Sequence, residues 1–232
     1  MLNQVTHQDL GLISYQKAWD YQTILNKKLI ARKRAFEEEK GYKPYHYLLT
    51  CEHKPVYTLG KSGSMDNLLL NSSELSSSSF EFFKINRGGD ITYHGPGQLV
   101  VYPIFDLEYF FRDIHRYVRQ LEEVVIRTLA DYGIEATRQK DYTGVWILDE
   151  NGPSRKICAI GVHLSRWVTL HGLAFNINSN LSHFDNIIPC GIDEGDKTVT
   201  SLEKELGKKV DLEEVKMKIK SHFASLFEYK YV

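Results

Sequence analysis

Groups of strand-like residues, separated by helical segments, limit the folds that this chain of 232 residues can adopt. Between Ile114 and Tyr132, apolar residues recur every three or four positions, the spacing of a helix that buries one face. Apolar residues followed by charges predict another amphipathic helix over Tyr15 to Lys40. A further helix is expected over Asp211 to Phe227, with Asp211 as its N-cap.

Runs rich in β-branched and aromatic residues predict the strands. Residues 71–79 are rich in serine and are expected to form a loop between two of these strands. The runs cover residues 45–51, 56–59, 82–86, 99–105, 143–148, 156–164 and 167–177. The last two are joined by Ser165-Arg166 and predict a hairpin. Sheet runs interrupted by separated helices favour an α+β domain with a mixed or antiparallel sheet over repeating βαβ units. No linker divides the pattern, so we expect residues 1–232 to form a single domain.

Composition excludes several classes of protein. With 29 basic and 30 acidic residues the net charge is −1, which is not the basic footprint of a nucleic-acid-binding protein. Neither a charged N-terminus followed by an apolar run nor a stretch of about 18 apolar residues is present, so we expect a cytoplasmic protein with no membrane partner. The three cysteines, Cys51, Cys158 and Cys190, form no C-x-x-C pair and no zinc-like spacing, which predicts neither disulfides nor a structural metal.

The segment RGGDITYHGPGQ, residues 87–98, lies between two expected strands and is the most unusual part of the chain. It contains four glycines and one proline, interleaved with Arg87, Thr92, His94 and Gln98. Glycine has no Cβ, so such a loop lets the backbone approach a ligand closely. A hairpin turn alone does not need these polar residues, and we therefore expect a binding loop.

Two further segments carry chemically useful residues. KICAIGV, residues 156–162, begins an apolar strand with Lys156, and HGLAFN, residues 171–176, follows it across the expected hairpin. In FDNIIPCGI, residues 184–192, Cys190 stands between a proline and a glycine in an expected loop. Such a cysteine is not embedded in an apolar strand, which makes it a candidate nucleophile.

Several familiar motifs are absent. Gly60-Lys61-Ser62 resembles the end of a phosphate-binding P-loop, but Pro55 stands where that motif requires glycine. The chain also lacks H-E-x-x-H, G-x-S-x-G and a G-x-G-x-x-G that follows a strand. These absences weaken a zinc peptidase, a serine hydrolase and a dinucleotide-binding enzyme as interpretations.

Taken in this order and spacing, the three segments closely resemble the lipoyl(octanoyl) transferase family, the octanoyltransferases of lipoate assembly. The resemblance extends to GLISYQ (11–16), EHKPVYTLG (52–60) and GVW (144–146), and covers about Gly11 to Leu202. The family shares its fold with the catalytic domains of biotin and lipoate protein ligases. The resemblance therefore implies a mixed α/β domain with a mostly antiparallel or mixed sheet flanked by helices.

By position in the motifs, the resemblance implies that Cys190 is the acyl-thioester nucleophile and that Lys156 lowers the pKa of its thiol. It also implies that the acyl pocket is lined by Arg87, Gly88, Gly89, Asp90, Ile91, Thr92, Tyr93, His94, Ala159, Ile160, Gly161, Gly172, Leu173 and Ala174. Cys158 departs from the family pattern, in which alanine is expected. Because side chains in a strand alternate with period two, Cys158 is expected on the same side as Lys156.

The implied reaction moves an octanoyl group from octanoyl-acyl-carrier protein, through a cysteine thioester, to a lysine of a lipoyl domain. The acceptors would be the lipoyl domains of 2-oxoacid dehydrogenases and the glycine cleavage H protein, and no cofactor is needed. A nearby ammonium would favour the thiolate of Cys190. Backbone amides of the glycine-rich segments, or His94, could stabilise the oxyanion. Either Lys156 or His94 could accept the proton of the incoming lysine.

Two alternatives remain open at this point. An ATP-dependent lipoate or biotin-type ligase of the same fold would activate a free acid as an adenylate and would not need Cys190 as a nucleophile. A non-catalytic acyl-binding protein would keep the pocket but form no acylated intermediate.

Overall fold

The computed structural model describes residues 2–35, 44–149, 152–188 and 197–232, and its centre is a nine-stranded mixed sheet. From one edge to the other, the strands follow the order β12-β1-β2-β6-β10-β9-β8-β7, and β11 pairs with β9 beside this path. The strands are β12 (Tyr229–Tyr231), β1 (Asn3–Ile13), β2 (His46–His53), β6 (Gln98–Ile104), β10 (Val168–Asn176), β9 (Ser154–Ser165), β8 (Tyr142–Ile147), β7 (Thr137–Gln139) and β11 (Lys197–Val199).

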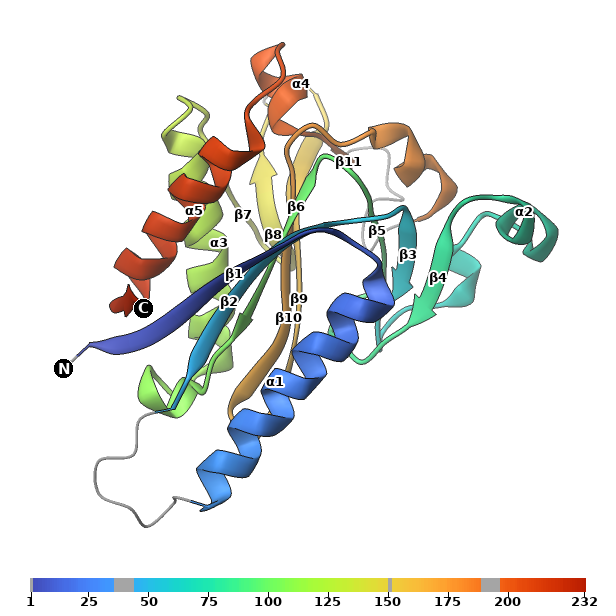
Figure 1. The fold of residues 1–232 in the computed structure, drawn as a ribbon. Helices are drawn as coiled ribbons and strands as arrows, with labels where there is room; N and C mark the ends of the chain where they lie inside the picture. The colour runs from blue at the N-terminus through green and yellow to red at the C-terminus, as the bar shows by residue number, and fades with distance from the viewer. Residues whose placement is uncertain (1, 36–43, 150–151, 189–196) are drawn as a thin grey trace.

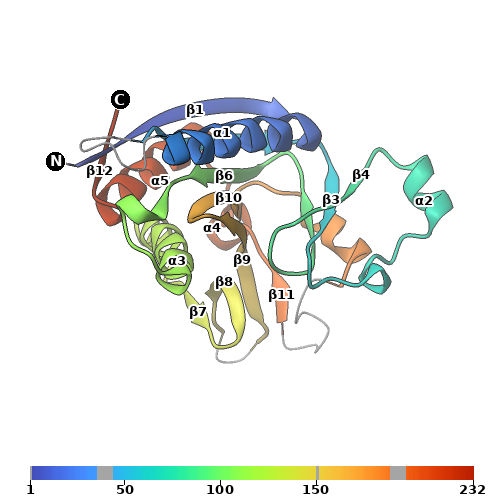
Figure 2. The same ribbon diagram turned by 90° about the horizontal axis from the view of Figure 1, so that it is seen from below.

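Helices cover both faces of this sheet, as Figures 1 and 2 show. Helix α1 (Tyr15–Ala35) lies on one face, and α3 (Ile114–Ala130) and α5 (Leu212–Leu226) lie side by side on the other. The side chains of β6 alternate between these layers: Leu99 and Val101 pack under α3 and α5, and Val100 and Tyr102 face α1. The central strands are therefore apolar on both faces.

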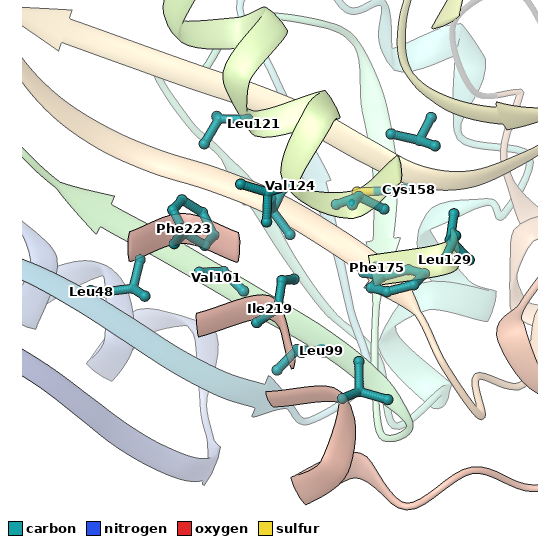
Figure 3. Close-up of a cluster of buried hydrophobic side chains, with 14 of the residues drawn as sticks. Leu48, Leu99, Val101, Leu121, Val124, Leu129, Cys158, Phe175, Ile219 and Phe223 are labelled. Carbon is teal, nitrogen blue, oxygen red and sulfur yellow. The ribbon is translucent and has the colours of Figure 1, made fainter. Parts of the chain in front are cut away.

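The larger core lies between the sheet and the pair α3 and α5 (Figure 3). Leu121, Val124 and Leu129 of α3 and Ile219 and Phe223 of α5 meet apolar side chains of the sheet there. Asp113 caps α3 by accepting a hydrogen bond from the amide of Arg116, and Asp211 caps α5 by accepting one from Glu213. The expected helices are thus confirmed, including the N-cap at Asp211, while residues 36–40 of the first expected helix lie outside the described residues.

A smaller, three-stranded sheet stands at one end of the molecule, in the order β4-β3-β5. Its strands are β4 (Glu81–Lys84), β3 (Val56–Leu59) and β5 (Ile91–His94). Strand β5 lies inside the glycine-rich segment that we expected to be a loop throughout, and all four of its residues are buried. That expectation was wrong because a short buried strand between glycines leaves no periodic signal.

The serine-rich segment was also mistaken for a loop. Residues Ser72–Ser77 form the short helix α2, and Asn71 caps it. The Asn71 side chain accepts hydrogen bonds from the amides of Ser73 and Glu74, while Glu74 reaches back to the amide of Asn71. This capping box is a recognisable helix start that outweighs the low helix propensity of serine.

The expected hairpin of β9 and β10 is confirmed, with its turn one residue later than predicted. Arg166 and Trp167 both have positive φ, 51° and 64°, as in the two-residue turns that suit twisted strands. Strand β1 was not predicted, because Val5 alone of its residues is fully buried and its polar sequence shows no alternation. Strands β7, β11 and β12 and helix α4 (Leu202–Leu206) were missed as well. No helix in the described part of the chain is long and apolar enough to cross a membrane.

Candidate active site

A cavity of about 230 Å³ lies where the N-terminus of α1, the sheet face of β6, β9 and β10, and the smaller sheet meet. Its described lining residues are Tyr15, Arg87, Gly89, Asp90, Ile91, Thr92, His94, Gln98, Val100, Tyr102, Asp141, Tyr142, Thr143, Lys156, Ala159, Ile160, Gly161, His171, Gly172, Leu173, Ala174, Asn176, Phe184 and Val199. The cavity therefore brings together the glycine-rich segment and the two strands of the hairpin, which are far apart in the sequence.

The floor of this cavity is made of small residues that face each other across the strands. Gly161 of β9 pairs with Gly172 of β10, and Ala159 pairs with Ala174, which in turn pairs with Val100 of β6. A Cβ added to Gly172 would lie 2.1 Å from the carbonyl oxygen of Val101. The strand backbone itself thus forms much of the floor, and an apolar chain can lie directly on it.

Arg87 fixes the glycine-rich segment to the rest of the site. Its Nη2 donates to the carbonyl oxygen of Thr58 at 2.7 Å and to the hydroxyl at 3.0 Å, and its Nη1 donates to the carbonyl oxygen of Gly88 at 3.1 Å. Glycines make room for this arrangement: a Cβ on Gly60 would meet the oxygen of Gly89 at 2.2 Å, and one on Gly161 would meet Cδ of Arg87 at 2.9 Å. The guanidinium is therefore held in a buried position by close backbone contacts.

His94 is a buried, uncharged imidazole with a defined tautomer. The Gln98 amide nitrogen donates to the backbone carbonyl oxygen of Tyr93 and to the side-chain Oδ1 of Asn176, so the Gln98 Oε1 accepts a hydrogen bond from His94 Nδ1–H at 2.8 Å. Nε2 then carries the lone pair and lies 3.4 Å from the Thr58 hydroxyl. Burial, with His53 nearby, holds the pKa of His94 well below its ordinary value. His94 has no N–H to offer an oxyanion and is a poor proton acceptor.

Lys156 lines the cavity near the N-terminal end of β9, with its Nζ 4.6 Å from the centre of the Trp146 ring. In the sheet, Lys156 pairs with Trp146 of β8 on one side and with Val199 of β11 on the other. Gly144 leaves the space for this packing, since a Cβ there would lie 2.5 Å from the carbonyl oxygen of Cys158 and 3.5 Å from Cε of Lys156. The ammonium group is thereby placed at the cavity by strand pairing and an aromatic ring.

A β-bulge separates Lys156 from Cys158. Val145 pairs with Cys158 and Trp146 with Lys156, so Ile157 is an extra residue on β9. Ile157 and Cys158 both pack in the core under α3 and α5, whereas Lys156 lines the cavity. The expectation that Cys158 lies on the same side as Lys156 is therefore wrong. Figure 3 shows the Cys158 sulfur among core side chains, and burial raises the pKa of its thiol.

Two of the residues that the sequence placed in the pocket do not line it in the described part of the chain. The first is Gly88, whose amide donates to the carbonyl oxygen of Val162 at 3.0 Å and so holds the glycine-rich segment against β9. Tyr93 points to the other face of β5, where its hydroxyl lies 2.7 Å from His183 Nδ1. Thr92 and His94 line the cavity, whereas Tyr93 packs in the buried cluster with Tyr57 and Phe184. The other predicted pocket residues line the cavity, as does Lys156.

Cys190 lies outside the described residues. Described residues of the chain on each side of it border the cavity: Phe184 precedes it, in the 3₁₀ helix Leu181–Asn186, and Val199 follows it, on β11. Tyr57 fixes the earlier segment, since its hydroxyl donates to the carbonyl oxygen of His183 at 2.8 Å and accepts from Asn186 at 2.9 Å.

The sequence interpretation missed part of the lining. Val100 and Tyr102 could have been found, because both lie an even number of residues from Gln98 on one strand and so share its face. Tyr15 lies in GLISYQ, one of the segments that carry the family resemblance, but was not named as a pocket residue. Asp141, Tyr142 and Thr143 come from a segment with no sequence signal for a site. Among the described residues, no group of three or more His, Cys, Asp or Glu side chains could hold a metal ion.

A model of the protein family described as the lipoyl protein ligase A/B catalytic domain matches residues 14–224. Two curated relatives, both named octanoyltransferase, show how far the similarity extends. The protein from Flavobacterium johnsoniae is 53% identical over 234 residues, covering 100% of both chains. The one from Cytophaga hutchinsonii is 53% identical over 225 residues, covering 95% of this chain and 91% of its own.

Solved structures share the fold at low sequence identity. A bipartite lipoate protein ligase from Thermoplasma acidophilum, solved with its E2 lipoyl domain, has a TM-score of 0.70 at 14% identity and covers 100% of this chain and 86% of its own. A lipoate-protein ligase A bound with ATP has a TM-score of 0.66 at 14% identity, with 100% and 90% coverage. The mixed α/β architecture expected from the sequence is confirmed.

Gly144 should be intolerant of any side chain. We expect Gly144→Ala to cost about 3 kcal/mol or more in the free energy of unfolding, because its φ of 127° and the Cys158 carbonyl both oppose a Cβ. Gly133→Ala is the matched control, since its φ is 74° but nothing lies within 4 Å of the added Cβ, and it should cost about 1–2 kcal/mol. Urea unfolding of both variants measures this, and equal losses would show that the contact at Gly144 does not matter.

Proposed function

Since this chain belongs to the family of the lipoyl protein ligase A/B catalytic domain, we propose that its cavity holds an octanoyl group as a thioester on Cys190. Octanoyl transfer in protein lipoylation is its activity, and it is an acyltransferase. Full-length identity of 53% to an octanoyltransferase is the observation that carries this conclusion. We propose further that residues 1–232 form one catalytic domain and that the enzyme is cytoplasmic.

The cavity suits a flexible hydrocarbon chain. Its floor of paired glycines and alanines offers apolar surface without side chains that project into the space. Val100 adds a larger apolar side chain to the wall. Burial of an acyl chain there gains about 0.8 kcal/mol for each methylene group removed from water, which supports medium-chain acyl binding.

Lys156 supports Cys190 as the nucleophile. A cysteine near its ordinary pKa is mostly protonated at neutral pH, and an adjacent ammonium stabilises the thiolate. Lys156 is a cavity-lining lysine on the strand that pairs with β11, the first described element after Cys190. Cys51 and Cys158, by contrast, are each fully buried, and burial raises the pKa of both thiols.

The reaction has two balanced halves. The Cys190 thiolate attacks the donor thioester, the carbonyl carbon exchanges one sulfur for the other, and the departing thiolate takes a proton from the Lys156 ammonium. Lys156, now neutral, accepts a proton from the acceptor lysine as its amine attacks the acyl-enzyme. The amide forms, and the Cys190 thiolate and the Lys156 ammonium are regenerated. We assign this proton transfer to Lys156 because burial holds the pKa of His94 well below its ordinary value, which makes the lone pair on its Nε2 a weak base.

We propose octanoyl-acyl-carrier protein as the donor. Lipoyl domains are the acceptors, in agreement with the octanoyltransferase relatives and with a ligase of this fold solved with its own lipoyl domain. We propose that these acceptors are the lipoyl domains of 2-oxoacid dehydrogenases and the glycine cleavage H protein.

Transfer should proceed without a nucleotide, because the donor thioester is already activated. The test uses two reactions with a lipoyl domain: octanoyl-acyl-carrier protein without ATP, and free octanoate with ATP and magnesium. We expect the acylated domain, detected by mass, only in the first. Since a solved ligase of the same fold binds ATP, product in the second reaction alone would reject the transferase and favour a ligase.

Lys156→Ala should raise the pKa of the Cys190 thiol by about one unit or more, because the cation that favours the thiolate is lost. The rate of iodoacetamide labelling between pH 5 and pH 10 measures it, and the buried Cys51 and Cys158 should not react. Lys197→Ala is a matched control, since Lys197 also lies over an aromatic ring, Tyr142, at 4.7 Å, but does not line the cavity. An unchanged labelling profile in Lys156→Ala would exclude the proposed role.

A further inference from the structure

The cavity ends where the helix α1 closes over the sheet. Along β10 its lining residues begin at His171, whereas Val168 and Leu170, nearer the hairpin turn, are packed in the core cluster beneath α1. Along β6 the last lining residue is Tyr102, and Ile104 belongs to the same covered cluster. His171 and Tyr102 therefore mark the closed end of the cavity among the described residues.

Lys156 lies toward the other end. On β9 it comes before Ala159 and Gly161, and Gly161 pairs with Gly172, the neighbour of His171. Because Ile157 is an extra residue, Lys156 and Gly161 are four ladder steps apart, which at about 3.3 Å per step is roughly 13 Å along the strand. A chain attached near Lys156 and lying on the paired glycines and alanines thus points toward His171.

His171 reaches the cavity only because its backbone is unusual. Its φ is +63°, a left-handed conformation that is rare for a residue other than glycine. Neighbouring Leu173 and Phe175 alternate toward the core under α3 and α5, and regular alternation would direct residue 171 the same way. Instead the imidazole lies on the α1 side, 6.4 Å from the ring of Trp19.

The surroundings hold this conformation in place. Pro103 of the adjacent strand has no N–H for the ladder, and its Cδ would lie 2.8 Å from a Cβ on Gly172. The His171 amide donates to Oε1 of Gln22 on α1, at 3.1 Å, which ties this position to the helix. Strained backbone of this kind, at about 1–3 kcal/mol, persists where the surrounding structure enforces it and is concentrated at functional sites.

The imidazole is anchored at one nitrogen. His171 Nε2 lies 2.8 Å from the Asn86 side-chain oxygen, and Nδ1 finds no hydrogen-bond partner among the described residues. Burial, with Arg87 nearby, lowers the pKa of His171 to about 3, so the ring is neutral. It is a rigid, uncharged wall that an apolar chain can meet but cannot easily displace.

We infer that His171 is a chain-length determinant: its imidazole closes the acyl cavity, accepts an octanoyl chain and excludes longer ones. This inference rests on the proposed function and adds the residue that sets its specificity. A longer chain would have to move the imidazole from its hydrogen bond with Asn86, and that loss would leave the buried imidazole without a hydrogen-bond partner.

His171→Gly tests the inference, because glycine adopts the native φ without strain and removes the ring. His171→Asn is a second variant, since asparagine also tolerates positive φ and shortens the side chain less. Arg166→Gly is the matched control. Arg166 also has a positive φ, 51°, in the turn of the same hairpin, so glycine relieves the same kind of backbone strain there, but Arg166 does not line the cavity. Each protein receives equimolar octanoyl-, decanoyl- and dodecanoyl-acyl-carrier protein with a lipoyl domain, and mass spectrometry quantifies each product.

We expect the ratio of decanoyl to octanoyl product to rise about tenfold or more in His171→Gly, and by a smaller factor in His171→Asn. The factor of ten corresponds to 1.4 kcal/mol of differential binding of the longer chain. Arg166→Gly should keep the wild-type ratio. If wild type transfers octanoyl but both His171 variants keep its chain-length profile, the inference is rejected. If wild type transfers no acyl group, the proposed function fails instead.

Discussion

The direct contact between the Arg87 segment and strand β9 determines how the site is built. The Gly88 amide donates to the carbonyl oxygen of Val162, and no Cβ at Gly161 holds the two backbones apart. This contact seats the smaller sheet on the larger one and buries the guanidinium of Arg87 between them. The cavity is the space left beside it, so its shape follows from backbone proximity more than from large side chains.

A second constraint determines which side chains enter that space. Regular strands alternate, but β9 has a bulge at Ile157 and β10 has a left-handed residue at His171. The bulge directs Lys156 into the cavity while Cys158 stays in the core, and the left-handed residue turns an imidazole toward the closed end. Both irregularities lie beside the site, where bulges and strained residues are most common.

The sequence predicted the helices and most strands, because periodic burial leaves a direct signal. The predicted residues that line the cavity were named through the resemblance to the lipoyl(octanoyl) transferase family. It could not predict that Cys158 leaves the side of Lys156, because one extra residue reverses every later side chain and has no local sequence mark. Strand β1 was missed because its residues gain their place from pairing with β2 and β12 and show no apolar alternation. The bulge in β9 and the place of β1 both depend on pairing between strands that are far apart in the sequence, and the residue pattern of one segment carries no information about that pairing.

Covalent chemistry at Cys190 is the central claim, and intact-protein mass after mixing with octanoyl-acyl-carrier protein tests it most directly. Wild type and Cys158→Ala should each gain one octanoyl group that hydroxylamine removes, because the adduct is a thioester and Cys158 is buried in the core. Cys190→Ala should gain none. An adduct that survives in Cys190→Ala and disappears in Cys158→Ala would contradict the account.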